Sequence, residues 1–238
     1  MDYASSYRKF VASVLSRQQA PEAAMAEAVG GYFDEFSQLM LKILVEAGLK
    51  PEHYLIDVGC GSGRLTKSAA PYLTGRYLGT DVVPALLENA RKFGKPGWQF
   101  EEVSSVAIPE QDGVADVVCF FSVMTHLLHE DSFRYLREAK RVLKPDGRIV
   151  FSFLEFRVYA TRTVFREMVE RRDTGRERVM DQFVSRDAIE AWADELNLEI
   201  VKIAGGDENQ IVEDGSGVYS LGQSVCVLQR LRRSPSSE

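Results

Sequence analysis

The chain has 238 residues, of which 45% are hydrophobic and 27% charged, and its formal net charge is −6 at pH 7. This composition is typical of a soluble globular protein, and the length predicts a single domain over 1–238 with a substantial core. The acidic balance argues against nucleic-acid binding, which needs a basic face for phosphates. No apolar run is long enough for a signal peptide or a membrane span, so we expect a cytoplasmic protein without membrane or nucleic-acid partners.

The three cysteines, Cys60, Cys119 and Cys226, lie far apart in the sequence, each in an apolar or glycine-rich setting. This spacing is typical of buried, reduced thiols and fits neither a disulfide framework nor a zinc site. We therefore expect no metal site built on them.

Helical patterns occupy the first part of the chain. Aromatic and apolar side chains recur four positions apart, as in Tyr3 with Tyr7 and Phe10 with Val14, which places each pair on one helix face. Three segments show such a pattern: 2–19, a stretch from Pro21 that Gly30 and Gly31 interrupt, and 32–44. We expect 1–50 to form a helical cover on the flank of the following sheet.

A glycine-rich turn follows the first predicted strand, 53–58. It reads Asp57-Val58-Gly59-Cys60-Gly61-Ser62-Gly63, and a helical pattern starts directly after it, at Arg64. Glycines let the backbone turn sharply and let a ligand approach bare main chain. Doubly wound α/β domains build their nucleotide sites from such a strand, turn and helix, at the carboxyl ends of their strands. The G-x-G-x-G spacing departs from the G-x-G-x-x-G of dinucleotide-binding folds, which disfavours an NAD-dependent oxidoreductase.

An acidic residue also ends the second predicted strand, 76–80. This residue, Asp81, lies one strand–helix–strand unit beyond Asp57 and is placed to accept hydrogen bonds from both hydroxyls of a ribose. Alternatively, Asp81 only caps the next predicted helix, 84–93.

The remaining chain continues the alternation of strands and helices. The predicted elements are strands at 98–103, 115–121, 149–154, 198–204 and 219–228, a helix at 132–142, a turn at 143–148 and a last crossover helix from Ser185. We therefore predict an α/β fold with a doubly wound, mostly parallel seven-stranded sheet. The last strand of the sheet is antiparallel. Helices at the N-terminus precede the sheet, and a helical insertion follows the fifth strand.

Two blocks of sequence resemble the class I S-adenosylmethionine-dependent methyltransferases. They are the glycine motif with Asp57 and the stretch 116–153, which includes the Leu-Lys-Pro-Asp-Gly turn. The resemblance implies S-adenosylmethionine as cofactor, bound by a core at 51–154, with a helical insertion or lid at 155–184, a last helix and closing hairpin at 185–229, and a tail at 230–238. The cofactor-binding residues that it implies are Asp57, Gly59, Cys60, Gly61, Asp81, Val82, Ser105, Val106 and Phe121.

The resemblance also raises two points at the edges of this core. N-terminal helices often form a lid over the cofactor in this family, and Tyr3 and Tyr7 are the candidate lid residues here. The family often binds adenine through an Asp that would fall at Ser104 in this sequence. A serine hydroxyl, the backbone around Ser105 and Val106, or packing must then replace it.

Two of the three histidines, His126 and His129, lie on the loop after the fourth predicted strand. A histidine titrates near neutrality and is the commonest general base, which an alcohol or amine acceptor needs when it is methylated. We predict His126, and secondarily His129, as catalytic residues. The alternatives are that His126 packs at the helix entry and that His129 faces solvent beside the helix cap. Their spacing with Glu130 and Asp131 gives no convincing metal site.

The insertion carries seven arginines and five acids between 155 and 179. Arginine can grip a carboxylate or phosphate, so an anionic substrate group is one interpretation, and a solvated helix face balanced by its own acids is the other. We expect methyl transfer to oxygen or nitrogen of a small molecule, by a monomer or homodimer. A protein acceptor, or a cofactor-binding domain without turnover, are the alternatives.

Overall fold

The computed structural model describes residues 3–17, 32–176, 180–215 and 217–231. Its strands form one seven-stranded sheet in the order β3-β2-β1-β4-β5-β7-β6, and within the described chain only β7 runs antiparallel to its neighbours. The strands are β1 Leu55–Val58, β2 Tyr77–Asp81, β3 Gln99–Glu102, β4 Ala115–Phe120, β5 Leu143–Phe153, β6 Leu198–Ala204 and β7 Ser224–Arg230. The predicted fold class is therefore confirmed.

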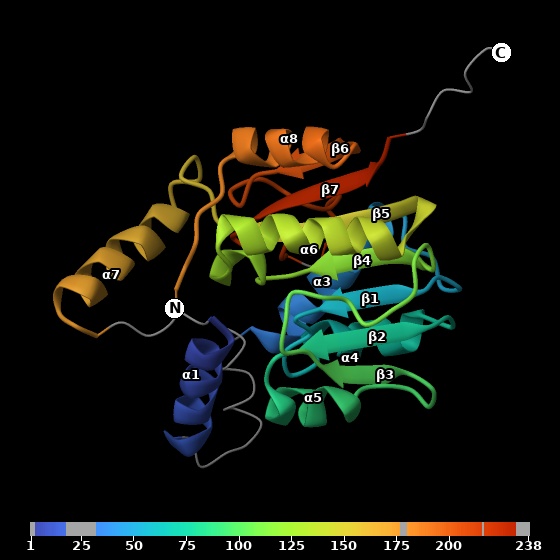
Figure 1. The fold of residues 1–238 in the computed structure, drawn as a ribbon, viewed down its shortest axis with the longest axis horizontal. Coiled ribbons are helices and arrows are strands. Elements are labelled where there is room, and N and C mark those ends of the chain that lie inside the picture. The colour runs from blue at the N-terminus through green and yellow to red at the C-terminus, as the bar shows by residue number, and fades with distance from the viewer. Residues whose placement is uncertain (1–2, 18–31, 177–179, 216, 232–238) are drawn as a thin grey trace.

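Helices cover both faces of this sheet (Figure 1). They are α1 Tyr3–Arg17, α3 Phe33–Glu46, α4 Arg64–Tyr72, α5 Pro84–Arg91, α6 His129–Val142, α7 Thr161–Asp173 and α8 Arg186–Glu195, with a short 3₁₀ turn, η1, at Met124–His126. Successive residues of β1 point to opposite faces: Ile56 packs with α6 and α8, and Leu55 packs with α3 and α4. Because both faces are covered, β1 reads as a continuous apolar run.

Two element boundaries differ most from the predicted ones. The expected turn at 143–148 belongs to β5, because Leu143 already pairs with Ala115; a register shift then separates this pair from that of Val117 with Arg148. The turn is thus an irregularity inside a strand, as β-bulges are. Strand β7 starts at Ser224, later than the expected 219, after a loop in which Gly222 takes a positive φ. The predicted helix from Pro21 lies outside the described residues.

Helices α1 and α7 both lie at the end of the sheet where the parallel strands finish (Figure 1). Val11 and Val14 of α1 pack against Val83 and Leu86 at the start of α5. In α7, only Thr161 is buried. None of the described helices is both long and apolar enough to cross a bilayer.

Candidate functional site

The glycine turn after β1 is shaped by close protein neighbours. The N–H groups of Gly59 and Cys60 both donate to the carbonyl of Thr80, at 2.7 and 2.9 Å, which ties the turn to the end of β2. Gly59 has a φ of +72°, and a Cβ there would collide with Cγ2 of Val123, in the loop after β4. The turn therefore needs glycine at Gly59 for its backbone conformation and for the close approach of that loop.

Asp81, the last residue of β2, reaches back to the glycine turn. Its Oδ2 accepts from the N–H of Gly61 at 3.0 Å, and its Oδ1 accepts from the N–H of Val83 at 2.9 Å. Burial raises the pKa of this carboxyl to about 6, although backbone hydrogen bonds oppose the shift. Each carboxylate oxygen retains capacity for a further hydrogen bond. Asp81 thus accepts a hydrogen bond from the backbone N–H ahead of α5, and it also presents an acceptor beside the glycine turn.

Asp57 lies beneath the turn, inside the sheet. Its Oδ2 accepts from the hydroxyl of Tyr77 at 2.7 Å, and its Oδ1 accepts from the thiol of Cys119 at 3.5 Å. Burial raises its pKa to about 6. These contacts make Asp57 a support for the turn from below. Cys60 lies in the turn itself, and it, Cys119 and Cys226 are buried free thiols, as the spacing of the cysteines predicted.

Helix α1 covers the end of β2. Nε of Arg8 donates to the carbonyl of Val82 at 2.7 Å, and Nη2 of Arg8 donates to Glu102 at 3.0 Å. Burial, and then the charge of Asp81, raise the pKa of Tyr7. The Tyr7 ring also lies 5.9 Å from the ring of His126. Tyr7 therefore lies between the acid that ends β2 and the histidine that follows β4. The side chain of Tyr3 lies outside the described residues.

Arg64, the first residue of α4, is a buried cation beside the glycine turn that was not among the predicted site residues. Its side chain is 6% exposed, and its guanidinium carbon lies 5.6 Å from the centre of the Phe36 ring. Burial lowers its pKa to about 10, opposed by Tyr7. Its position directly after the third glycine was the available signal.

The loop after β4 begins with a strained residue. Phe121 is buried, and Ser122 has a φ of +59°, a conformation that residues other than glycine rarely adopt. The N–H of Ser122 donates to Oγ of Ser152 at 2.7 Å, and that hydroxyl in turn donates to Gln223 at 2.7 Å. These bonds fix the start of the loop against β5 and the segment before β7.

His126 and His129 both bind the backbone of the segment 180–184. Nδ1 of His126 lies 2.9 Å from the carbonyl of Met180, and Nε2 of His129 lies 2.9 Å from the carbonyl of Phe183. Since a carbonyl only accepts, each of these nitrogens carries the proton, and the other nitrogen of the neutral ring carries the lone pair. The His129 ring also meets Trp192 edge-on at 5.5 Å, which engages it in packing.

The turn after β3 holds the two remaining predicted residues. The N–H of Val103 donates to the carbonyl of Asp81 at 3.0 Å, so this turn starts at the same edge of the sheet. Ser105 is exposed, and Val106 is partly buried against the core below α6. The predicted roles of both residues stay predictions.

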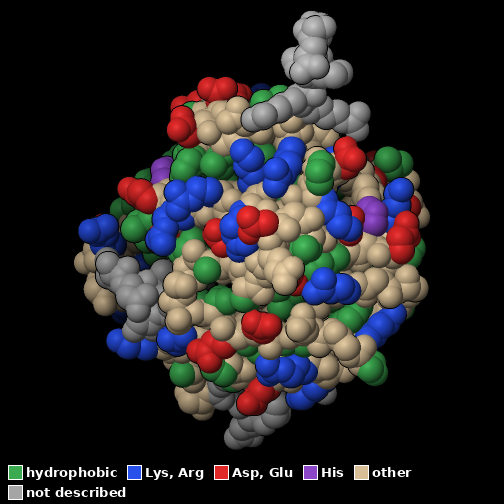
Figure 2. All heavy atoms as spheres, turned by 45° about the vertical axis from the view of Figure 1, so that its right-hand side comes forward, with side chains coloured by type: hydrophobic (Ala, Val, Ile, Leu, Met, Phe, Trp, Pro, Cys, Tyr) green, Lys and Arg blue, Asp and Glu red, His purple; other side chains and the backbone are tan. Residues whose placement is uncertain are grey.

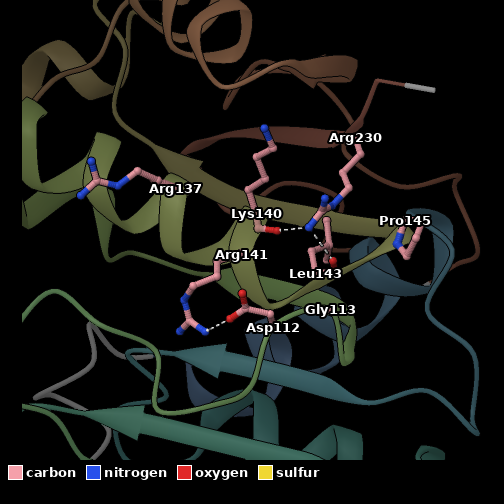
Figure 3. A pocket seen from close by; sticks show the side chains of 8 residues that line it. All are labelled: Asp112, Gly113, Arg137, Lys140, Arg141, Leu143, Pro145 and Arg230. Carbon is pink, nitrogen blue, oxygen red and sulfur yellow. Dashed lines mark hydrogen bonds and ion pairs between the residues drawn. The ribbon is translucent and has the colours of Figure 1, made fainter. Parts of the chain in front are cut away.

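A basic pocket of about 490 Å³ lies at the opposite edge of the sheet (Figure 3). Figure 2 brings this side forward and shows Lys and Arg side chains gathered above the centre, with acids among them. Three of the cations that line the pocket are bound to protein: Arg230 donates to the carbonyls of Lys140 and Leu143, Arg141 pairs with Asp112 at 2.7 Å, and Lys140 donates to the carbonyl of Leu196. Their arrangement stabilises the end of α6, away from the glycine turn.

Comparisons with known proteins agree with this geometry. A model of the methyltransferase domain matches residues 56–151, which run from β1 into β5. The ubiquinone biosynthesis O-methyltransferase of Xanthomonas oryzae pv. oryzae is 27% identical over 63% of this chain and 64% of its own length. The chain spans between 30% and 64% of the length of three curated relatives that it matches.

Two solved structures share the fold. A putative methyltransferase of Haloferax volcanii, in complex with its Trm112 activator, superposes with a TM-score of 0.67 at 15% identity, over 90% of this chain and 96% of that one. The magnesium protoporphyrin IX methyltransferase of Synechocystis, with bound S-adenosylhomocysteine, has a TM-score of 0.61 at 15% identity, over 96% of both chains. Residues 56–151 therefore match a methyltransferase domain, and the chain has the fold of S-adenosylmethionine-dependent methyltransferases.

The cofactor that this match implies is S-adenosylmethionine, and the chemistry of the site fits it. A nucleoside needs acceptors for its ribose hydroxyls, which Asp81 offers. An amino-acid carboxylate needs a cation, and Arg64 is a buried one at the start of α4. Among the described residues, no group of three His, Cys, Asp or Glu side chains could hold a metal ion.

Proposed function

We propose that this methyltransferase methylates a hydroxyl group, or secondarily an amine, of a small organic acceptor, with His126 as general base. The observation that carries the proposal is the hydrogen bond between Nδ1 of His126 and the Met180 carbonyl, at 2.9 Å. It places the lone pair of the neutral ring on Nε2, the nitrogen that can take a proton from an acceptor.

In this proposal, the cofactor is held by groups at the carboxyl ends of β1 and β2. Asp81 accepts from the ribose hydroxyls, Arg64 pairs with the carboxylate of the methionine part, and Tyr7 covers the site from α1. Bound S-adenosylmethionine supplies an activated methyl group on a sulfonium. Because the donor is already activated, the protein has mainly to align the acceptor, exclude water and take up a proton.

An oxygen acceptor is supported by the relatives that methylate oxygen by name, such as the ubiquinone biosynthesis O-methyltransferase. A small acceptor is also supported by the cover over the site, because Tyr7 lies 5.9 Å from the His126 ring and restricts access from α1. Large acceptors would have to displace α1, whose Arg8 is bound to Val82 and Glu102.

Two measurements test the proposal. Calorimetry should show binding of S-adenosylhomocysteine, and labelled S-adenosylmethionine should transfer its methyl group to members of a panel of phenols, such as catechol, or of amines. His126→Ala should leave S-adenosylhomocysteine affinity nearly intact and lower the transfer rate roughly 10²–10⁴-fold, as loss of a general base does.

The matched control is His53→Ala, which removes the histidine whose Nδ1 accepts from the N–H of Lys50 at the far end of β1. It should leave the transfer rate unchanged. A normal rate in His126→Ala would remove His126 as the base, and S-adenosylhomocysteine binding without transfer to any acceptor would indicate a domain that has lost turnover.

A further inference from the structure

We infer that Asp181 is a positioning residue for His126, so that the insertion after β5 contributes a carboxylate to the proton-accepting machinery. The inference rests on the proposed function, in which His126 takes the proton of the acceptor. Asp181 lies in the segment 180–184, for which the sequence predicted no role in the reaction.

The contact lies at one nitrogen of the ring. Oδ1 of Asp181 is 3.5 Å from Nδ1 of His126, the same atom that lies 2.9 Å from the carbonyl of Met180. The side chains of His126 and Asp181 are 22% and 18% exposed. At this burial, the attraction between a carboxylate and an imidazolium is stronger than it would be in open water.

The backbone around Asp181 is held in place on the side of the histidines. The N–H of Gln182 donates to the carbonyl of Thr125 at 2.6 Å, and these two residues are the direct chain neighbours of Asp181 and His126. Two residues further on, the N–H of Val184 donates to the carbonyl of Leu154 at 2.8 Å. The pair is therefore positioned by bonds that involve neither of its side chains, as a preorganised site requires.

The charges around the pair are mixed. Asp181 faces His126 on η1 and the side chains of Glu167 and Arg171 on α7; burial raises its pKa, and the charges of His126 and Arg171 oppose the shift. The Tyr7 ring on α1 lies 5.9 Å from the His126 ring, tilted by 34°. The Asp181 carboxylate is thus an opposite charge beside the ring when the ring becomes positive.

The proposed step conserves atoms and charge. The acceptor oxygen gives its proton to Nε2 of His126 and forms a bond to the methyl carbon, and the electron pair of the broken carbon–sulfur bond stays on sulfur. The imidazole becomes an imidazolium, which the ionised Asp181 stabilises through Nδ1–H. The hydrogen bond to the Met180 carbonyl keeps the proton of the neutral ring on Nδ1. Asp181 therefore contributes charge and orientation, and its carboxylate remains ionised throughout.

The first test uses the protein without cofactor. Nitrogen-edited NMR should find the His126 proton on Nδ1, and Asp181→Asn should move that proton signal upfield. The control, Asp131→Asn, removes a carboxylate from the first turn of α6 that pairs with Arg134 at 2.9 Å, and it should leave the signal in place. A signal that is the same in all three proteins would overturn the inference before any acceptor is known.

The second test is kinetic, with catechol as the probe acceptor. Asp181→Asn should lower kcat about 10- to 100-fold, the size expected when one partly buried opposite charge is removed, with little change in KM or in S-adenosylhomocysteine affinity. Asp181→Glu should restore part of the rate, and Asp131→Asn should match the wild type. In a His126→Ala background, Asp181→Asn should have no further effect, because the two residues act as one unit.

Failure of the inference about Asp181 and failure of the proposed role of His126 give different results. A slow His126→Ala enzyme beside a normal Asp181→Asn enzyme would refute the inference and leave the proposed base intact. Equal losses from Asp181→Asn with and without His126 would assign Asp181 a merely structural role. A normal rate in His126→Ala would refute the proposed base itself, whatever the NMR signal of the pair.

Discussion

The N–H of Gly61 donates to Oδ2 of Asp81 at 3.0 Å, so one hydrogen bond joins the glycine turn after β1 to the end of β2. The other oxygen of the same carboxylate accepts from Val83, which precedes α5. One side chain thus organises two loops at the edge of the sheet where we propose that the cofactor binds. A substitution at Asp81 will therefore change cofactor affinity and the loops together, and the two effects have to be measured separately.

The first prediction concerns the affinity carried by Asp81. Asp81→Ala should weaken S-adenosylhomocysteine binding by about 2–3 kcal/mol, the value expected when a charged acceptor of two hydroxyl hydrogen bonds is lost. Calorimetry measures the affinity, and denaturant unfolding of the cofactor-free protein measures the structural part. Glu102→Ala, which removes the exposed partner of Arg8 at the end of β3, is the control. Unchanged affinity in a folded Asp81→Ala protein would leave Asp81 only its role ahead of α5.

The second prediction is a pH dependence of cofactor binding. Burial raises the pKa of Asp81 to about 6, and ribose hydroxyls donate best to the ionised carboxylate, so S-adenosylhomocysteine affinity should rise between about pH 5 and pH 7. Calorimetry at several pH values measures it, and Asp81→Asn should flatten the rise. An affinity that falls over this range would contradict the assignment.

The stability of the cofactor-free protein should depend on pH in the opposite direction, because protonation is linked to folding. The buried carboxyls of Asp57 and Asp81 both have pKa values raised to about 6, above their ordinary value. The folded state therefore binds protons more tightly than the unfolded chain. Their contribution to the free energy of unfolding is fully present below the ordinary pKa and is lost as the pH rises through about 6. The stabilisation that S-adenosylhomocysteine adds in thermal unfolding should accordingly grow from pH 5 to pH 7.

The third prediction separates the two reasons for glycine at Gly59. Gly59→Ala places a Cβ against Val123 at a φ of +72°, whereas Gly113→Ala meets nothing within 4 Å at a φ of +68°. The control should lose about 1 kcal/mol of unfolding free energy from backbone strain alone. Gly59→Ala should lose about 1–3 kcal/mol more through overpacking, and it should also bind S-adenosylhomocysteine more weakly. The added Val123→Ala substitution should recover part of the difference, and equal losses at Gly59 and Gly113 would show that the collision is relieved.

The fold was predictable from the sequence because its signals are local. The apolar run of β1, the glycine turn and Asp81 lie at the ends of successive strands, and parallel strands bring their carboxyl ends to one edge. The prediction of His126 as a site residue followed from the same rule, because it comes after the fourth strand. The Asp57 carboxylate was predicted to bind the cofactor; in the structure Tyr77 and Cys119 each donate to one of its oxygens, and the cofactor-binding role stays a prediction. Which face of a buried strand residue meets a ligand is not written in its local pattern.

The contacts that the sequence did not predict depend on the path of distant segments. The Asp181 contact with His126 requires the insertion to return past η1, which no spacing rule specifies. Arg8 binds the carbonyl of Val82 only because α1 packs on the start of α5. The strand status of Leu143 depends on its pairing with Ala115 across an irregular register, while the local Lys-Pro-Asp-Gly sequence is typical of a turn.

A further structural contact joins the two ends of the insertion. Glu155 follows β5, and Arg186 opens α8; they form a bidentate pair with distances of 2.8 and 2.9 Å, and Ser224 donates to Glu155 at 2.6 Å. The Glu155 side chain is 3% exposed. Burial alone would raise the pKa of Glu155, but the hydrogen bonds from Arg186 and Ser224 outweigh it and lower the pKa. The stabilisation is therefore present above the ordinary pKa of a glutamate and is lost as the pH falls through the lowered value.

The last prediction compares this pair with an exposed one. Glu155→Ala should cost about 3–5 kcal/mol of unfolding free energy, because it leaves the guanidinium of Arg186 without its buried partner. Glu167→Ala, which removes the exposed partner of Arg171 on α7, should cost about 0–1 kcal/mol. Because the pair closes the base of the insertion, Glu155→Ala should also let the segment 180–184 move and so disturb the NMR signal of His126. Denaturant unfolding and that signal measure the two effects, and a Glu155→Ala protein as stable as Glu167→Ala would show that the insertion is held by other contacts.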